Sequence, residues 1–221
     1  MPISREHPLR QLFGELVRRH FVRGVQLPDS DVVEYVTGIL TDFTHVDHLY
    51  RIRDARGRRI EEVAEMLVES NPLLEASSFD REREVRKHVG DFTLLFTGLF
   101  PEAVASLPRL RPLSIDTFID YVAAGKESYA VVAAFNLFEY RDEAPLFRRL
   151  SDRFEECVFG LNLVKREIEE VQARRISTTP LRSWTRFVGK CLTSRAHNRE
   201  RSTSRNLASP GSLSSRAATL C

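Results

Sequence analysis

Glycine and proline are scarce in this sequence of 221 residues, with 10 of each. Their scarcity argues against a fold of many short strands, which needs such residues at its turns. The three cysteines, Cys157, Cys191 and Cys221, lie far apart and form no CxxC pair. This spacing indicates no disulfide framework and a reducing compartment. No apolar leader follows Met1, so we expect a cytoplasmic protein.

Long apolar runs and catalytic motifs are also missing. The most apolar stretches, 92–100 and 129–138, fall far short of the roughly 20 residues that a membrane span requires. No GxSxG, HExxH, glycine-rich phosphate loop or dinucleotide-binding fingerprint occurs. We therefore expect no cofactor, and a non-catalytic role is favoured over an enzymatic one.

The composition present is that of a globular chain, with 42% hydrophobic and 29% charged residues. Its charge is uneven, because residues 176–221 hold 8 basic residues and one acid. Subtracting these from the totals of 33 and 31 leaves 25 basic and 30 acidic residues in 1–175. Arginine outnumbers lysine in the acidic part as well, so this bias does not predict a nucleic-acid partner.

Apolar residues recur at helical spacing through residues 1–175. Capping residues, glycines and prolines separate the periodic segments. The pattern predicts six helices, over about 8–23, 29–43, 58–69, 81–100, 115–138 and 143–174. We expect the last helix to be the longest and to lie at the centre of a single irregular bundle.

The last predicted helix carries an unbroken apolar seam. Its residues follow one another at intervals of three and four: Phe147, Leu150, Phe154, Cys157, Leu161, Val164, Ile168 and Val171. Such a heptad pattern fits either an intermolecular coiled coil or a long helix packed inside a bundle. Wide phenylalanine rings suit a globular core better, so we expect Phe154 and Leu161 to be core residues.

His88 is the most notable single polar residue, because it lies on the apolar stripe of the helix predicted at 81–100. Asp91 is three residues ahead and Glu84 four residues behind, so the three side chains project from neighbouring positions. With Tyr121, His88 and Asp91 form a candidate catalytic or ligand site inside the bundle. The favoured interpretation is a structural core histidine that is hydrogen-bonded to a polar neighbour, because no ExxH pair supports a metal centre.

Two polar clusters have both a functional and an ordinary interpretation. His45 and His48, three residues apart, could share a metal ion on a helix, but no third ligand is evident. Helix-end polar residues explain them better. A run of five arginines follows: Arg51, Arg53, Arg56, Arg58 and Arg59. Acidic neighbours interleave with it, which favours a solvated, salt-bridged connector over a nucleic-acid surface.

The segment 180–192 predicts a basic amphipathic helix that begins at Pro180. Trp184 and Phe187 lie on its apolar face, while Arg182, Arg186 and Lys190 line another face. Such a helix can contact an anionic membrane surface weakly or lie in the groove of an acidic partner. Packing against its own acidic domain is the favoured interpretation. Residues 193–221 are rich in serine, threonine and arginine, and we expect them to be a disordered tail.

These patterns predict an all-α protein with three parts: a helical bundle over 1–175, a basic amphipathic segment over 176–192 and a tail over 193–221. The expected function is a protein-interaction or regulatory module with an unidentified protein partner. Two alternatives stay open. One is an enzyme or ligand- or metal-binding protein with a site near His88, and the other is peripheral membrane association through 180–192.

Overall fold

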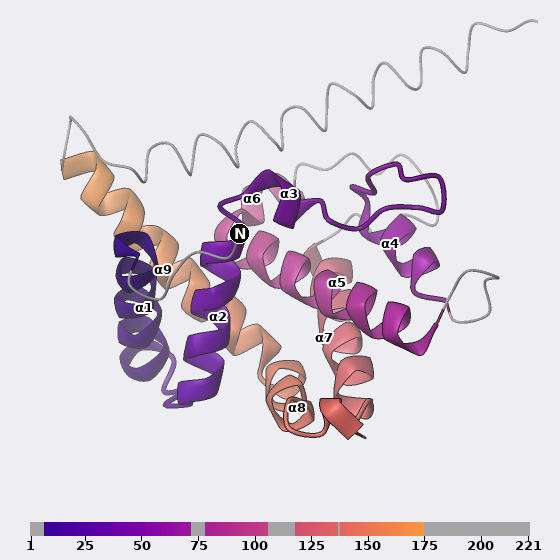
Figure 1. Ribbon diagram of the computed structural model, residues 1–221. Helices are drawn as coiled ribbons and strands as arrows, with labels where there is room; N and C mark the ends of the chain where they lie inside the picture. Colours follow the sequence, from indigo (N-terminus) through magenta and orange to yellow (C-terminus); the bar gives the residue numbers. More distant parts are fainter. Residues whose placement is uncertain (1–6, 72–77, 106–117, 137, 175–221) are drawn as a thin grey trace, which may run out of the picture. The chain divides into compact units, whose positions relative to one another are not determined.

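The computed structural model describes residues 7–71, 78–105, 118–136 and 138–174, all within one compact unit, Met1–Arg182 (Figure 1). These residues are mostly helical, and their one β-type pairing is an isolated antiparallel bridge between Arg53 and Arg59. The predicted all-α fold class is therefore confirmed. The amphipathic segment 176–192 and the tail 193–221 lie outside the described residues, so their predictions stand untested.

The helical elements follow the predicted order, with several short additions. They are α1 (Pro8–Arg19), η1 (His20–Gly24), α2 (Ser30–Asp42), α3 (Val46–Leu49), α4 (Val63–Glu69), α5 (Phe79–Leu99), α6 (Pro101–Ala105), α7 (Phe118–Ala134), η2 (Phe138–Tyr140), α8 (Ala144–Asp152) and α9 (Phe154–Arg174). The predicted cap of α2 is present, because the Asp29 side chain accepts hydrogen bonds from the backbone N–H groups of Asp31 and Val32 at 3.0 and 3.1 Å.

Three predicted boundaries were wrong. The helix expected over 115–138 ends earlier, as α7, at Ala134. The helix expected from Arg58 begins only at Val63, because residues 52–60 form a turn in which the Ile60 N–H donates to the Ile52 carbonyl at 3.0 Å. Gly57 permits this turn with a φ of +78°. The last predicted helix is divided into α8 and α9 at Arg153, whose φ of −111° and ψ of 26° are not helical.

The central helix is α5, not the last helix as expected. Both α5 and α9 have 21 residues, but fourteen residues of α5 are buried. Figure 1 shows α5 crossing the middle of the unit, where it packs against α2, α4, α6, α7 and α9. The polar residues His88 and Asp91, in the middle of α5, are consequently buried, and this position determines the candidate site.

The heptad seam of α8 and α9 faces the core. Seven of its members are buried, with exposed fractions of at most 3%: Phe147, Leu150, Phe154, Cys157, Leu161, Val164 and Ile168. Phe159, on the same helix but outside the seam, is 51% exposed. The seam therefore serves packing within the bundle, as the favoured interpretation predicted.

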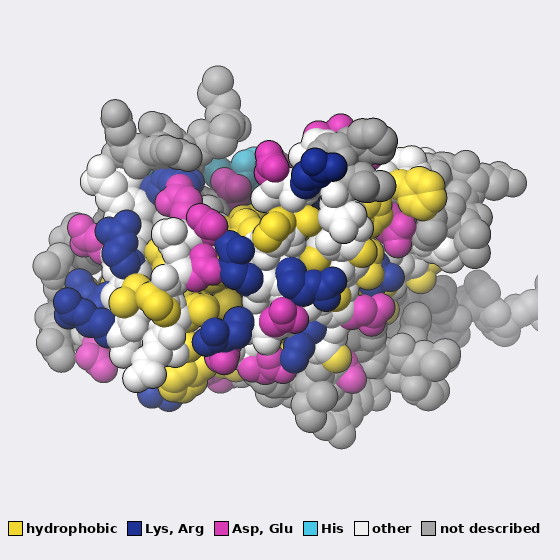
Figure 2. Space-filling model, turned by 90° about the horizontal axis from the view of Figure 1, so that it is seen from below, with side chains coloured by type: hydrophobic (Ala, Val, Ile, Leu, Met, Phe, Trp, Pro, Cys, Tyr) yellow, Lys and Arg dark blue, Asp and Glu magenta, His cyan; other side chains and the backbone are white. Residues whose placement is uncertain are grey.

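The surface mixes charges of both signs. Figure 2 shows basic and acidic side chains interspersed on one face, with apolar side chains visible between them. Of the helices in the described ranges, none combines the length and apolar character needed to cross a bilayer.

Candidate functional site

The candidate site is built around a buried carboxylate, Asp91, in the middle of α5. Its Oδ1 accepts hydrogen bonds from the Tyr35 hydroxyl of α2 at 2.7 Å and the Tyr129 hydroxyl of α7 at 2.9 Å. Asp91 is only 8% exposed. One carboxylate oxygen therefore ties three helices together, and it does so at a considerable desolvation cost.

Gly90 makes this arrangement possible. A Cβ at Gly90 would lie 2.5 Å from the Tyr129 ring, closer than real atoms approach. The absence of a side chain lets the ring lie flat against α5, with its hydroxyl at Asp91. The Tyr129 ring also packs against the rings of Phe147 and Phe154, with centroids 5.7 and 5.9 Å away.

Asp91 lines an open groove of about 470 Å³ between α2 and α5. One wall is a single face of α2, with Tyr35, Gly38, Ile39 and Asp42 at helical spacing. Its volume falls within the range of small-molecule sites. The groove thus gives a nearly buried carboxylate a way out to solvent.

The surroundings of Asp91 shift its pKa and the pKa values of its two tyrosine donors. Burial raises the pKa of Asp91, while the positive charge of Lys87 and the hydrogen bonds from the two tyrosines oppose this rise. Burial, followed by the charge of Asp91, raises the pKa of Tyr35 and of Tyr129 well above the ordinary value. Both tyrosines therefore stay protonated at neutral pH and act as hydrogen-bond donors to the carboxylate.

Two cations line the same groove without an ion pair. Within the described residues, neither Arg51 nor Lys87 lies at ion-pairing distance from a carboxylate. The Lys87 ammonium lies 5.5 Å from the ring centroid of Tyr35. Arg10 behaves differently, because it pairs with Glu34 at 2.6 Å. The charges of Arg51 and Lys87 are therefore available to a ligand.

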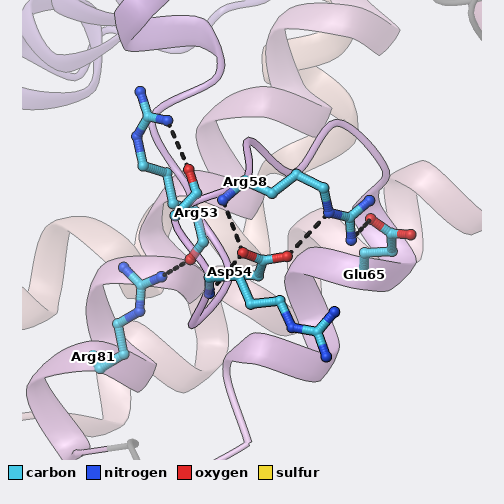
Figure 3. A network of polar contacts seen from close by, with 7 residues as sticks. Arg53, Asp54, Arg58, Glu65 and Arg81 are labelled. Carbon is cyan, nitrogen blue, oxygen red and sulfur yellow. Dashed lines mark hydrogen bonds and ion pairs between the residues drawn. The ribbon is translucent and has the colours of Figure 1, made fainter.

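The other arginines of the basic run are held in a local network (Figure 3). Asp54 accepts hydrogen bonds from the Arg58 side chain at 3.0 Å and the Arg58 backbone at 2.9 Å, and these bonds lower the pKa of Asp54. Arg59 pairs with Asp47 at 2.7 Å, and Arg81 donates to the Arg53 carbonyl at 2.8 Å. Arg58 and Arg59 therefore form the ion pairs that the connector interpretation predicts, while Arg51 lines the groove.

His88 does not take part in the site. It is fully buried beside the rings of Phe43 and Phe92, with centroids 5.7 and 6.1 Å away, and neither ring nitrogen forms a hydrogen bond of ordinary geometry with the residues that the structure describes. The groove is lined by its neighbour on the helix, Asp91, and not by His88 itself. The structure therefore favours the core interpretation of His88, although without the expected polar partner.

His88 should make the protein sensitive to acid. Burial, and then the charge of Arg51, lower the pKa of His88 from 6.5 to about 3. The unfolded chain binds this proton below about pH 6.5, whereas the folded protein excludes it until about pH 3. Stability therefore falls as the pH drops through this window, by up to about 1.4 kcal/mol per pH unit.

Urea unfolding at pH 7 and pH 5 tests this sensitivity. We expect wild type to lose roughly 2 kcal/mol more than His88→Leu between these two pH values, because only wild type carries the buried imidazole. Titration of the carboxylates is common to both proteins and cancels in the comparison. Equal losses in wild type and variant would show that His88 is protonated in the folded state or hydrated.

The remaining sequence candidates do not join the groove as a group. The rings of His45 and His48 lie 5.5 Å apart, and only His48 lines the groove. No three His, Cys, Asp or Glu side chains gather into a possible metal site within the described ranges. Tyr121 is buried in α7 and does not line the groove. Cys157 is buried as well, and burial raises the pKa of its thiol to about 12. Trp184, Phe187, Arg182, Arg186 and Lys190 lie outside the described residues.

Comparisons with known proteins place no constraint on this site, because the chain matches no protein-family model, no curated protein and no solved structure. Asp91 was predicted from the sequence as a site residue, whereas Tyr35, Lys87 and Arg51 were not. Lys87 was detectable, since it precedes Asp91 by four residues on the same helix face. Tyr35 was not, because its contact with Asp91 spans 56 residues and depends on helix packing.

Proposed function

We propose that the helical domain is a non-catalytic regulatory module that binds a small molecule in the groove between α2 and α5. The observation that carries this proposal is the combination of a nearly buried carboxylate, Asp91, with two cations, Arg51 and Lys87, that have no ion pair among the described residues. Burying a carboxylate lowers stability unless it is fully compensated, and such groups concentrate at functional sites.

The arrangement favours binding over catalysis. Asp91 and Tyr129 are buried and joined by a hydrogen bond, and His88, also on α5, is fully buried beside the rings of Phe43 and Phe92. The buried Cys157 thiol stays protonated because burial raises its pKa. These groups hold a polar surface in place, but they do not form a nucleophile and base within reach of each other.

Amide chemical shifts of isotopically labelled protein test the proposal. A panel of anionic, neutral and cationic metabolites of similar size is added in turn. We expect the binding compounds to shift the amides of groove residues, with Gly38, Ile39 and Lys87 among them, and to leave α4 and α9 unchanged. The proposal fails if no compound shifts the groove amides, or if only a protein partner does.

A further inference from the structure

We infer that the ligand of this groove is a small organic acid that carries a hydroxyl or ammonium group next to its acid group. This inference rests on the proposed function, and it specifies the chemistry that the groove recognises. It follows from the placement of four charged side chains: Arg51, Lys87, Asp42 and Asp91.

The cations of the groove provide a place for the anionic group. Arg51 lines the groove together with Tyr35 and Asp91, and its positive charge opposes the rise in the pKa of Asp91 that burial causes. Lys87 acts on Asp91 as well and stands one helical turn before it on α5. A carboxylate or phosphate between Arg51 and Lys87 would gain charge-assisted hydrogen bonds from both.

The floor of the groove provides a hydrogen-bond acceptor. Both tyrosine hydroxyls donate to Oδ1 of Asp91, so Oδ2 receives no hydrogen bond from the residues that the structure describes. Among the described residues, the buried side-chain atoms that lack a hydrogen-bond partner belong to residues that do not line the groove. Asp91 does line the groove, so its Oδ2 can be reached by a ligand. A ligand hydroxyl or ammonium that donates to Oδ2 would complete the coordination of this carboxylate.

The charge balance of the groove disfavours ligands that carry charge of one sign only. Arg10 and Glu34 neutralise each other at 2.6 Å, which leaves Arg51 and Lys87 opposed by Asp42 and Asp91. A compound that is only anionic would face two carboxylates, and a compound that is only cationic would face two cations. A molecule that carries an acid group and a donor side by side satisfies both sets.

Titrations with four small compounds test the inference by amide shifts on the full chain. L-lactate and L-alanine each combine an acid group with a donor, propionate keeps the acid group alone, and lactamide keeps the hydroxyl without a charge. We expect L-lactate or L-alanine to bind in the groove roughly tenfold more tightly than propionate and lactamide. The inference is wrong if propionate or lactamide binds as tightly as both of them.

Arg51→Gln provides the matching protein variant. Between L-lactate and L-alanine, we take the compound that binds wild type more tightly. We expect Arg51→Gln to lower the affinity for this compound roughly tenfold, because a charge-assisted contact is lost. Arg56→Gln removes the same charge from the same loop, at a residue that does not line the groove, and should leave affinity unchanged. Equal effects of the two variants would contradict the inference. If a compound of another class binds in the groove, this inference is wrong but the proposed function still holds. If no compound binds in the groove in any titration, both the inference and the proposed function are wrong.

Discussion

Phe154→Ala is expected to lower the free energy of unfolding by about 3–5 kcal/mol. The Phe154 ring is fully buried at the start of α9, where it packs against the Tyr129 ring with centroids 5.9 Å apart. Gly125 of α7 has no side chain at the point where this ring approaches. Truncation would remove apolar contacts and leave a cavity between α7 and α9, because helices that approach this closely cannot collapse further.

Phe159→Ala is the matched control, because it makes the same chemical change five residues later on the same helix. Phe159 is 51% exposed, so its truncation should change stability by no more than about 0.5–1 kcal/mol. Urea unfolding followed by far-UV circular dichroism measures both variants. If Phe154→Ala left stability unchanged and instead dissociated a dimer, the seam would be an intermolecular interface.

Asp91→Ala is expected to lower the free energy of unfolding by about 2–4 kcal/mol, through a small cavity and the loss of an acceptor. The Tyr129 hydroxyl is fully buried and donates to Asp91 at 2.9 Å, so it would be left without a partner. Tyr35 is half-buried beside the groove and can turn its hydroxyl to water. Most of the loss should therefore depend on Tyr129.

A double-mutant cycle isolates this dependence. Tyr129→Phe should destabilise wild type by about 1 kcal/mol or more, yet be neutral or stabilising when Asp91→Ala is already present. Tyr140→Phe serves as the control, because the Tyr140 hydroxyl donates to the exposed Asp80 at 2.8 Å and should contribute little. Additive effects of Asp91→Ala and Tyr129→Phe would show that the hydrogen bond between them does not stabilise the fold.

The sequence predicted the fold class and the core more fully than it predicted the boundaries. Helical periodicity reports which residues are buried, and for this reason the seam through Phe154 and Leu161 was correctly assigned to the core. The division at Arg153 does not interrupt that periodicity, so the pattern could not reveal it. The central position of α5 was also hidden, because it depends on which helices pack together and not on the length of any one helix.

The candidate site could also be predicted only in part, because its local pattern is visible in the sequence whereas its contacts between distant helices are not. Asp91 was identifiable as a carboxylate on an apolar helix, but its expected partner, His88, turned out to be a separate buried residue. The actual partners, Tyr35 and Tyr129, lie on helices distant in sequence. Arg51 looked like one member of a basic run, and only the structure separates it from Arg58 and Arg59, which form ion pairs with nearby carboxylates.

Filling the groove tests most directly whether it is the binding site. Gly38 of α2 lines the groove, and a Cβ at this position would meet no atom within 4 Å. Gly38→Leu should therefore occupy the groove without disturbing the fold, and it should raise helix stability by up to about 1 kcal/mol. Gly14→Leu on α1 is the control, since its Cβ would lie at an ordinary 3.7 Å from the Thr37 methyl group and outside this groove.

The measurement is the affinity of the tightest-binding compound for wild type, Gly38→Leu and Gly14→Leu, determined by amide shifts. If the groove between α2 and α5 is the binding site, Gly38→Leu will remain folded and lose binding, while Gly14→Leu will bind as wild type does. Undiminished binding to a folded Gly38→Leu protein would contradict the assignment of the groove as the binding site.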